Sequence, residues 1–252
     1  MSNHLNSPTL PRHRILNAVL ATMISASAVQ AQASRVVRQD GLIEVNGGRL
    51  YYEMRGAEST MLATPVILVH GPTLDCRSWD AQFKVLSKFF TTYRYDLRGH
   101  GLSDAVTGPV GSHEDLIGLM DALGIEKAHV IGQSLGGNIV TEVAVSHPQR
   151  AETLTLIDSG INGFTSPTPN VPLNSQFELC PETYSRLSLI RIPTLVLVGE
   201  FDHPEFQTAA DILHQQIKGA SKVVIPAAGH MSHQEEPQEV TWEILEFLLQ
   251  RQ

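Results

Sequence analysis

From residue 36 onwards, short apolar runs alternate along the chain with segments whose apolar residues recur at helical spacing. Two of the runs, Val66–Val69 and Leu195–Val198, are apolar at every position. Continuous runs of this kind are typical of strands buried on both faces of a parallel sheet. The pattern predicts strands at Pro65–Val69, Thr92–Asp96, Ala128–Ile131, Thr153–Ile157, Thr194–Gly199 and Ser221–Ile225.

The segments between these runs have the period of amphipathic helices. Ser112 and Asp115 form the Ser-x-x-Asp signature of a helix N-terminus, and apolar residues at helical spacing continue to Leu123. The same period predicts helices over 139–145, 211–217 and 239–249. Because strands that alternate with helices of this length form right-handed βαβ crossovers, we expect an α/β fold with a mostly parallel, doubly wound sheet.

Two segments depart from this alternation. Asn46-Gly47-Gly48 separates the strand-like runs Gly41–Val45 and Leu50–Met54, and these turn residues tolerate the positive φ of a tight hairpin. We therefore expect the sheet to begin with an antiparallel hairpin. Further on, Gly160–Ile190 contains four prolines and no convincing helical pattern before residues 181–189, so it is expected to be an irregular excursion between two strands.

The first 33 residues have the order of a secretory signal peptide. Arg12 and Arg14 precede an uncharged, mostly apolar run from Ile15 to Val29, and small residues follow up to Ala33. The run is shorter than the roughly 20 residues that a spanning helix needs. We therefore expect a cleaved leader, a mature domain of residues 34–252 without stable membrane insertion, and a secreted or periplasmic protein. An uncleaved anchor is the alternative.

Composition excludes several classes of protein. Of 252 residues, 42% are apolar and 17% charged, which is the balance of a globular domain rather than of a disordered, collagen-like or coiled-coil chain. Lys and Arg number 18 against 26 Asp and Glu, and no basic run is present, so nucleic-acid binding is not expected. Two cysteines cannot form a Cys-rich zinc site or a framework of disulfides.

The motif with the clearest chemistry is Gly132-Gln133-Ser134-Leu135-Gly136, which lies between a predicted strand and a predicted helix. A sharp strand-to-helix turn forces the central serine into a strained backbone conformation and lifts its hydroxyl clear of the sheet. The glycines are required because side chains at their positions would clash. Ser134 is therefore the candidate nucleophile.

A serine hydroxyl is a weak nucleophile and needs a base, which an acid orients in turn. Asp202 and His230 each follow a predicted strand, and the carboxyl ends of parallel strands meet at one edge of the sheet. The candidate triad is Ser134, Asp202 and His230. Asp158, which also follows a strand, is the alternative acid, and His233 is the alternative base.

Other polar residues are given structural interpretations. His113, His147 and His214 lie in helical segments and are expected to face solvent. Asp75 and Asp80 are expected to be turn and capping residues.

Six motifs follow one another along the chain: His70-Gly71, Trp79-Asp80, Asp96–Ser103, Gly132–Gly137, Val198–Asp202 and Gly229-His230. Together they resemble the α/β-hydrolase superfamily, most closely its single-domain esterases, enol-lactonases and cofactor-free haloperoxidase-like members. The resemblance extends from about Gly41 to the C-terminus. It implies a serine nucleophile, a histidine base and an oxyanion hole of two backbone N–H groups, the first from Leu135, with no cofactor or metal. In the family, Asp96–Ser103 would be a structural turn.

The chain departs from the family pattern at two points. The second oxyanion donor usually follows the His-Gly pair, but Pro72 stands there and has no N–H to donate. Either Thr73 supplies the donor or the hole is half built. In addition, Gly160–Ile190 is about half as long as a lid of several helices would need, so we expect a short lid excursion.

The resemblance and the residues together predict an α/β-hydrolase fold with an eight-stranded, mostly parallel sheet, helices on both faces and a reduced lid. The expected function is a serine hydrolase of small-molecule carboxylic esters or lactones that works through an acyl-enzyme. A perhydrolase or haloperoxidase-like activity, and a binding or sensor protein that retains the triad, are the alternatives. The acyl and alcohol parts of the substrate and the oligomeric state stay open.

The two cysteines leave one structural question open. Cys76 lies beside the expected oxyanion hole and Cys180 near the end of the lid excursion. An exported protein matures where disulfides persist, and a bridge between them would close a loop of about a hundred residues. Two separate thiols are the alternative.

Overall fold

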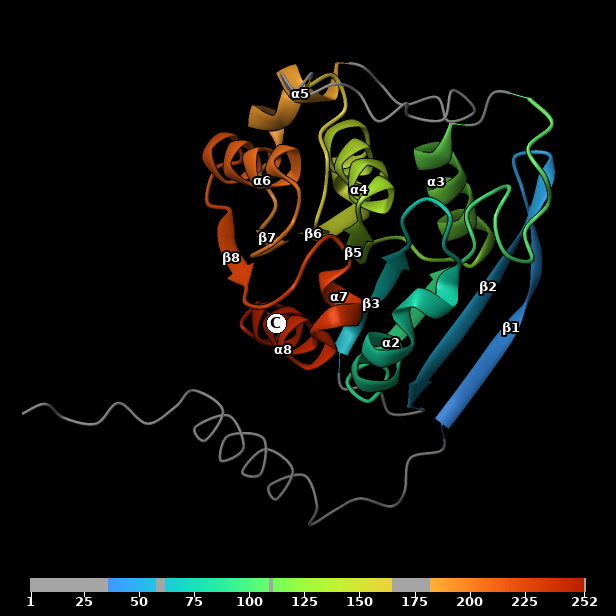
Figure 1. The fold of residues 1–252 in the computed structure, drawn as a ribbon. Helices are drawn as coiled ribbons and strands as arrows, with labels where there is room; N and C mark the ends of the chain where they lie inside the picture. Colours follow the sequence, from blue (N-terminus) through green and yellow to red (C-terminus); the bar gives the residue numbers. More distant parts are fainter. Residues whose placement is uncertain (1–35, 58–61, 109–110, 165–181, 252) are drawn as a thin grey trace, which may run out of the picture. The chain divides into compact units, whose positions relative to one another are not determined.

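The structure is a computed structural model that describes residues 36–57, 62–108, 111–164 and 182–251. Within these residues, eight strands form one sheet in the order β1-β2-β4-β3-β5-β6-β7-β8 (Figure 1). β2 pairs antiparallel with β1 and β4, and every other pair of neighbours is parallel. The strands are β1 Val36–Val45, β2 Gly48–Ala57, β3 Leu62–Val69, β4 Phe90–Tyr95, β5 Ala128–Gln133, β6 Ala151–Ile157, β7 Thr194–Gly199 and β8 Ser221–Ile225.

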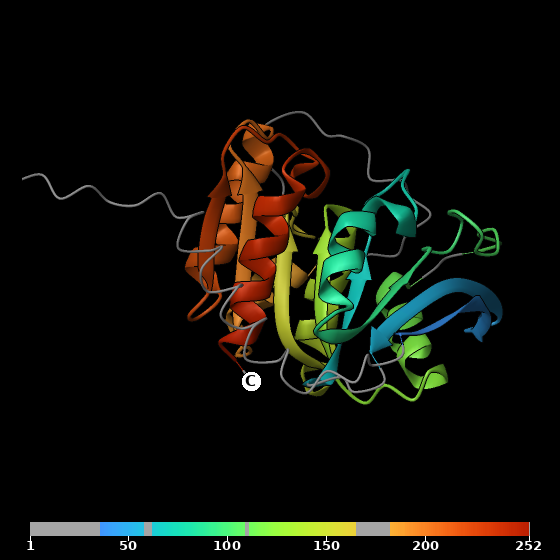
Figure 2. The same cartoon turned by 90° about the horizontal axis from the view of Figure 1, so that it is seen from below.

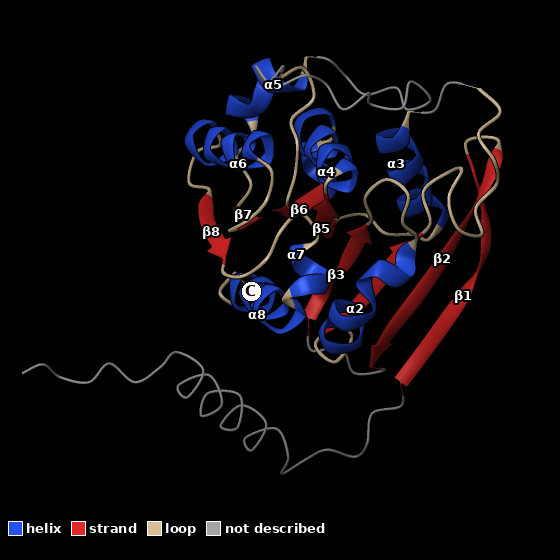
Figure 3. Ribbon diagram, in the orientation of Figure 1, coloured by secondary structure: helices blue, strands red, loops and turns tan. Residues whose placement is uncertain are grey.

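Helices cover both faces of this sheet, as the edge-on arrangement in Figure 3 and the view from below in Figure 2 show. On one face lie α3 (Ser112–Ala122), α4 (Leu135–Ser146) and α6 (Pro204–Gln216), and on the other lie α2 (Asp80–Leu86) and α8 (Pro237–Leu249). The predicted fold, a mostly parallel sheet between two helical layers, is confirmed. The shorter elements are η1 Cys76–Trp79, η2 Pro148–Arg150, α5 Thr183–Arg186, η3 Leu187–Leu189 and α7 Ser232–Glu235.

The central strands contribute to both hydrophobic cores. Along β3, Ile67 and Val69 pack in the core beneath α3, α4 and α6, whereas Val66 and Leu68 pack in the core beneath α2 and α8. Successive side chains of a strand point to opposite faces, so a strand covered on both sides must be apolar at every position. Fully burying one such side chain stabilises the fold by about 1.5–3 kcal/mol. This explains the continuous apolar runs of the sequence.

The predicted hairpin begins the sheet. Val45 pairs with Gly48, and the two residues between them, Asn46 and Gly47, have φ angles of 48° and 77°. Two positive φ angles define the tight turn whose twist matches that of the flanking strands. The side-chain amide of Asn46 also donates to the backbone oxygen of Glu114 at 3.0 Å, which ties the hairpin to α3.

Three of the helices longer than four residues differ from the prediction, and one of them, α6, begins at Pro204 rather than at Asp211. α2 was not predicted, because its seven residues are too few to show a helical period. α4 begins at Leu135 rather than at Ile139. Gly136 in its first turn is required by a close approach, since a Cβ there would overlap the carbonyl oxygen of Val69.

The lid excursion is only partly described. Residues 160–164 and 182–190 are described, and α5 with η3 occupies most of the helical stretch predicted at 181–189. Residues 165–181 and the leader, 1–33, lie outside the described residues. Among the described helices, none combines the length and apolar composition that crossing a membrane requires.

Candidate active site

Ser134 lies at a sharp turn between β5 and α4. Its backbone has a φ of 53° and a ψ of −114°, a conformation that is strained for a residue with a side chain. The Ser134 N–H donates to the carbonyl oxygen of Ile157 at 2.9 Å, which holds the turn against β6. A Cβ on Gly132 would overlap the backbone of Gly136. The predicted elbow is present, with the glycines where close packing requires them.

The structure brings Ser134, His230 and Asp202 together at the carboxyl edge of the sheet. Nε2 of His230 lies 3.1 Å from Oγ of Ser134, and Nδ1 lies 2.9 and 3.2 Å from the two carboxylate oxygens of Asp202. The Asp202 side chain is fully buried, while a quarter of the His230 side chain is exposed. The distances are those of a nucleophile, a base and an orienting acid.

The environment of His230 favours its role as a base. Burial acts to lower its pKa, but the hydrogen bond and charge of the Asp202 carboxylate outweigh burial and raise the pKa above the usual histidine value. When Nδ1–H donates to Asp202, the lone pair of Nε2 faces the Ser134 hydroxyl and can accept its proton.

The alternative acid, Asp158, has a different set of partners. It is buried at the end of β6, and its carboxylate accepts hydrogen bonds from the N–H of Gly199 at 3.0 Å and from Ser232. Burial, together with the charge of Asp202, raises the pKa of Asp158 to about 7. Asp202, not Asp158, forms the hydrogen bond to His230.

The alternative base, His233, is part of the core. Its side chain is buried, and its ring centroid lies 4.6 Å from that of Trp79. Burial lowers the pKa of His233 to about 3, so its ring stays neutral and is a weak base. The geometry therefore favours His230.

His230 is held in place by Glu235, Gln133 and Phe206, none of which was among the candidate site residues. The carboxylate of Glu235 accepts the N–H groups on either side of His230, from Gly229 at 2.7 Å and Met231 at 3.0 Å. The amide of Gln133 donates to the His230 carbonyl oxygen at 3.0 Å, and the Phe206 ring lies 4.0 Å from the imidazole, centroid to centroid. Gln133 directly precedes Ser134 in the Gly-x-Ser-x-Gly motif, so its position in the sequence could have identified it as a site residue. Nothing in the sequence pattern distinguishes Phe206 or Glu235.

The expected oxyanion loop passes beside the nucleophile. A Cβ built on Gly71 would lie 3.3 Å from Cβ of Ser134. Thr73, two residues further on, is exposed and has a φ of 62°, and Leu135 is the buried first residue of α4. The donor roles of Leu135 and Thr73 stay predictions.

A buried histidine anchors this loop. Nδ1 of His70 lies 2.7 Å from the carbonyl oxygen of Gly71, and Nε2 accepts the N–H of Leu97 at 3.0 Å. Burial lowers the pKa of His70 to about 4, so the ring stays neutral and can make both bonds. Asp96 next to Leu97 accepts the N–H of Leu102 at 2.7 Å, in line with a structural turn over Asp96–Ser103.

The remaining expectations have mixed outcomes. Asp75 caps η1 by accepting the N–H of Arg77 at 2.9 Å, and Asp80 begins α2, where its carboxylate pairs with Arg94. His214 is exposed as expected. The expectation that His113 and His147 face solvent is wrong: they are half-buried, because α3 packs against α4.

The question of the disulfide is not resolved by the described residues. Cys76 is buried and forms no disulfide within that part of the chain, and burial raises the pKa of its thiol. Cys180 lies outside the described residues. The pairing of Cys76 with Cys180 therefore stays a prediction, which mass spectrometry of the non-reduced, alkylated protein would test.

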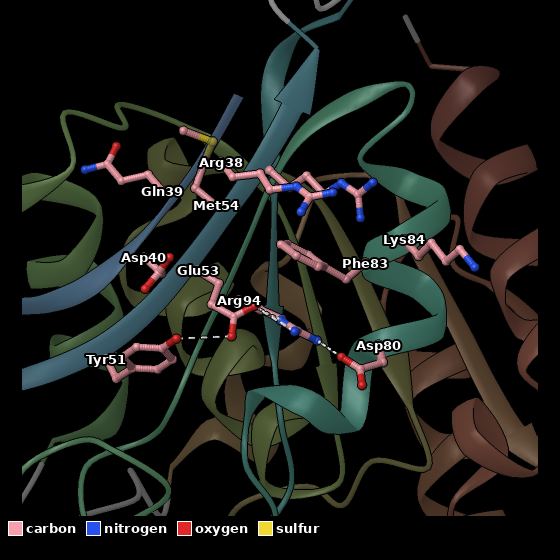
Figure 4. Close-up of a pocket in the computed structure, with 11 residues that line it drawn as sticks. Arg38, Gln39, Asp40, Tyr51, Glu53, Met54, Asp80, Phe83, Lys84 and Arg94 are labelled. Carbon is pink, nitrogen blue, oxygen red and sulfur yellow. Dashed lines mark hydrogen bonds and ion pairs between the residues drawn. The ribbon is translucent and has the colours of Figure 1, made fainter. Parts of the chain in front are cut away.

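A hollow of about 540 Å³ lies apart from the triad, between the first hairpin, β4 and α2 (Figure 4). Arg94 crosses it and pairs with Glu53 at 2.7 Å and with Asp80 at 2.6 Å. None of the three candidate triad residues lines it. We therefore do not assign it to the active site.

Comparisons with known proteins agree with this architecture. The family model described as the α/β hydrolase fold matches residues 64–184. "Putative carbamate hydrolase RutD" of Caulobacter sp. (strain K31) is 36% identical over 126 residues, which cover 48% of this chain and 45% of that protein. The chain thus matches less than half the length of this relative and of four more proteins of the same name.

Two further proteins match over most of their length. "3-oxoadipate enol-lactonase 1" of Acinetobacter baylyi is 24% identical over 243 residues, covering 76% of this chain and 90% of that protein. The crystal structure of the enol-lactonase from Burkholderia xenovorans LB400 superimposes with a TM-score of 0.72 at 25% identity, covering 83% of this chain and all of that one. The sheet order, the elbow and these matches agree: the chain belongs to the α/β-hydrolase superfamily.

Proposed function

We propose that the protein is a serine hydrolase that cleaves carboxylic esters or lactones through an acyl-enzyme. The proposal rests on one observation, the continuous path from Oγ of Ser134 to Nε2 of His230 at 3.1 Å and from Nδ1 to Asp202 at 2.9 Å. The strained backbone of Ser134 supports it, because strain of this kind presents a nucleophile to substrate. Two of the similar proteins are enol-lactonases by name, which supports the substrate class.

The reaction follows from the positions of these atoms. Oγ of Ser134 attacks the substrate carbonyl carbon, and its proton passes to Nε2 of His230 while Nδ1–H donates to Asp202. The C–O bond of the tetrahedral intermediate then breaks, and His230 gives its proton to the leaving alcohol. Water deacylates the serine by the same steps, with His230 taking a proton from the water and returning it to Ser134.

The oxyanion of the tetrahedral intermediate needs hydrogen-bond donors that face the former carbonyl oxygen. The N–H of Leu135 lies at the N-terminus of α4, where the helix dipole favours negative charge. Pro72 has no N–H to donate, so either Thr73 supplies the second donor or the hole is half built. Preorganised donors of this kind each contribute about 10²–10³-fold to the rate.

A fluorophosphonate probe tests whether Ser134 is a reactive nucleophile. The probe is expected to label the wild-type protein at Ser134 and not to label Ser134→Ala. Ser221→Ala, which changes an exposed serine on β8, is the matched control and keeps the labelling. Absence of labelling in the wild type would identify a binding or sensor protein instead of a hydrolase.

A substrate panel tests the bond that is cleaved. p-Nitrophenyl esters and simple lactones are expected to be hydrolysed, and His230→Ala is expected to abolish this turnover. An aryl carbamate belongs in the panel, because five of the similar proteins are carbamate hydrolases by name. Faster turnover of the carbamate than of any ester or lactone would contradict the proposed substrate class.

We further propose that residues 1–33 direct export and are removed. The order of charged, apolar and small residues in this segment supports the proposal. Expression of the full chain in a Gram-negative bacterium is expected to yield periplasmic protein whose mass begins near residue 34. Cytoplasmic protein with an intact N-terminus would contradict it.

A further inference from the structure

Two histidines and two glutamates meet where the start of α3 packs against the end of α4. His113 and Glu114 lie in the first turn of α3, Glu142 lies in α4, and His147 directly follows α4. The side chains of His113 and His147 are 17% and 26% exposed, and that of Glu142 is 1% exposed. Three of the four side chains therefore lie within the packing of the two helices, whereas that of Glu114 is 53% exposed.

The possible ligand atoms of His113, Glu114 and His147 lie close together. Oε1 of Glu114 lies 3.3 Å from Nε2 of His113 and 3.1 Å from Nε2 of His147. The ligand atoms of the three residues all lie within 4.8 Å of one another. A tetrahedral ion with bonds of about 2.0–2.2 Å holds its ligand atoms roughly 3.3–3.5 Å apart. Small side-chain movements would therefore place all three atoms around one ion.

Glu142, the fourth residue of the cluster, lies beside the imidazole of His113 and can orient it. Oε2 of Glu142 lies 3.1 Å from Nδ1 of His113, and the other carboxylate oxygen of Glu142 accepts the amide of Asn162. A histidine that binds a metal usually donates its second ring N–H to a carboxylate or carbonyl, which fixes the tautomer. With a metal bound, Glu142 would accept the N–H of Nδ1, and the lone pair of Nε2 would then be available to the ion.

We propose that His113, Glu114 and His147 bind one divalent transition-metal ion of the Zn²⁺ class, with Glu142 orienting His113. Two imidazoles and a carboxylate suit Zn²⁺, and a water molecule completes the fourth position. The 12 residues of α4 separate His147 from Ser134 by roughly 18 Å. The ion is thus too far from the nucleophile to act on its substrate, and it links α3 to the helix that begins at the elbow.

Titration of the metal-free protein with Zn²⁺ tests the site. Calorimetry is expected to show one equivalent of Zn²⁺ per chain, which His147→Gln and His113→Gln each remove. Glu142→Gln keeps all three ligands and is expected to weaken binding about 10–100-fold, as loss of an orienting partner does. His214→Gln, which changes an exposed histidine outside the cluster, is the matched control and is expected to bind as the wild type does.

Two further measurements do not depend on the folding of any variant. Co²⁺ in place of Zn²⁺ is expected to give the visible absorption of a four-coordinate site in the wild-type protein. Zn²⁺ is expected to raise the melting temperature, because an ion that binds only the folded state stabilises it. Binding that is the same in the wild type and the His113→Gln/His147→Gln double variant would overturn the proposal. The proposal would also be overturned if the single equivalent of Zn²⁺ were lost in His230→Ala and kept in the variants of His113 and His147.

Discussion

Ser232 donates both its backbone N–H and its hydroxyl to one carboxylate oxygen of Asp158, at 2.9 and 2.7 Å. Ser232 lies two residues after His230. The other oxygen of Asp158 accepts the N–H of Gly199, which lies three residues before Asp202. Asp158 therefore connects the loop that carries His230 with the loop that carries Asp202, and it does so without a hydrogen bond to His230.

This arrangement predicts different effects for the two carboxylates. Asp202→Asn is expected to lower kcat about 10⁴-fold, because the imidazole is then held in the wrong tautomer. Asp158→Asn is expected to have a much smaller effect, since the amide oxygen can still accept both bonds from Ser232, and only the bond from the Gly199 N–H is lost. Steady-state kinetics with a p-nitrophenyl ester compares the two variants. The reverse order of effects would show that Asp158 is the acid.

Asp158 also makes stability depend on pH. Burial raises its pKa to about 7, above the value of about 3.9 for an exposed aspartate, so the folded state binds this proton more tightly than the unfolded chain does. The corresponding stability is fully present below about pH 4 and is lost as the pH rises through about 7. The free energy of unfolding of the wild type is therefore expected to fall relative to Asp158→Asn between about pH 4 and 7, by at most about 1.4 kcal/mol per pH unit, and to level off above about pH 8. Urea denaturation across this range measures the difference, and a difference independent of pH would contradict the prediction.

The activity should follow the ionisation of His230. Because Asp202 raises the pKa of His230, kcat/KM for a neutral ester is expected to rise with a midpoint above about 6.5. In Asp202→Asn the carboxylate is gone while burial stays, so the midpoint is expected to move to lower pH. A pH–rate profile of both proteins checks the sign. A midpoint that is the same in both would mean that Asp202 does not set this pKa.

Glu235 is expected to act on the rate through the position of His230. In the wild type, the two carboxylate oxygens of Glu235 accept the N–H groups of Gly229 and Met231. Glu235→Gln leaves only one oxygen to accept them. Losing a hydrogen bond to a charged group costs about 1.5–3 kcal/mol, so kcat is expected to fall by up to about 10²-fold. Glu239→Gln, on the exposed side of α8, is the matched control and should match the wild type. Equal rates in all three proteins would remove Glu235 from the set of positioning residues.

Substitution of Pro72 tests whether the oxyanion hole lacks its second donor. The missing N–H of Pro72 is expected to limit turnover, so Pro72→Gly and Pro72→Phe should raise kcat for the best ester of the panel, by less than the about 10²–10³-fold of a complete donor. Single-turnover acylation rates measure the effect directly. A loss of rate in both variants would mean that Thr73 already serves as donor and that the fixed φ of Pro72 positions it.

The sheet, and the placement of the three candidate triad residues at one edge of it, were predictable from the sequence because each leaves a local signal. β3 contains the continuous apolar run Val66–Val69 and β7 the run Leu195–Val198, because their side chains enter both cores. Ser134, Asp202 and His230 follow strands, and parallel topology brings strand ends to one edge.

Features that depend on side-chain packing left no such signal. Phe206 contacts His230 only because α6 turns that side of its surface to the site, and the helical pattern alone does not show this. His113 and His147 are 34 positions apart and meet through the contact of α3 with α4, so their spacing could not indicate a shared cluster. The helix α2 was missed for a different reason, its length.

The packing of the elbow glycines limits what directed evolution can change around Ser134. A Cβ on Gly132 or Gly136 would overlap backbone atoms, which cannot rotate away, and one on Gly137 would overlap the side chain of Ser159. A saturation library over this turn is therefore expected to return glycine at 132 and 136 whatever substrate is used for selection. New specificity has to come from side chains beside the triad, such as Phe206, whose replacement leaves the turn itself unchanged.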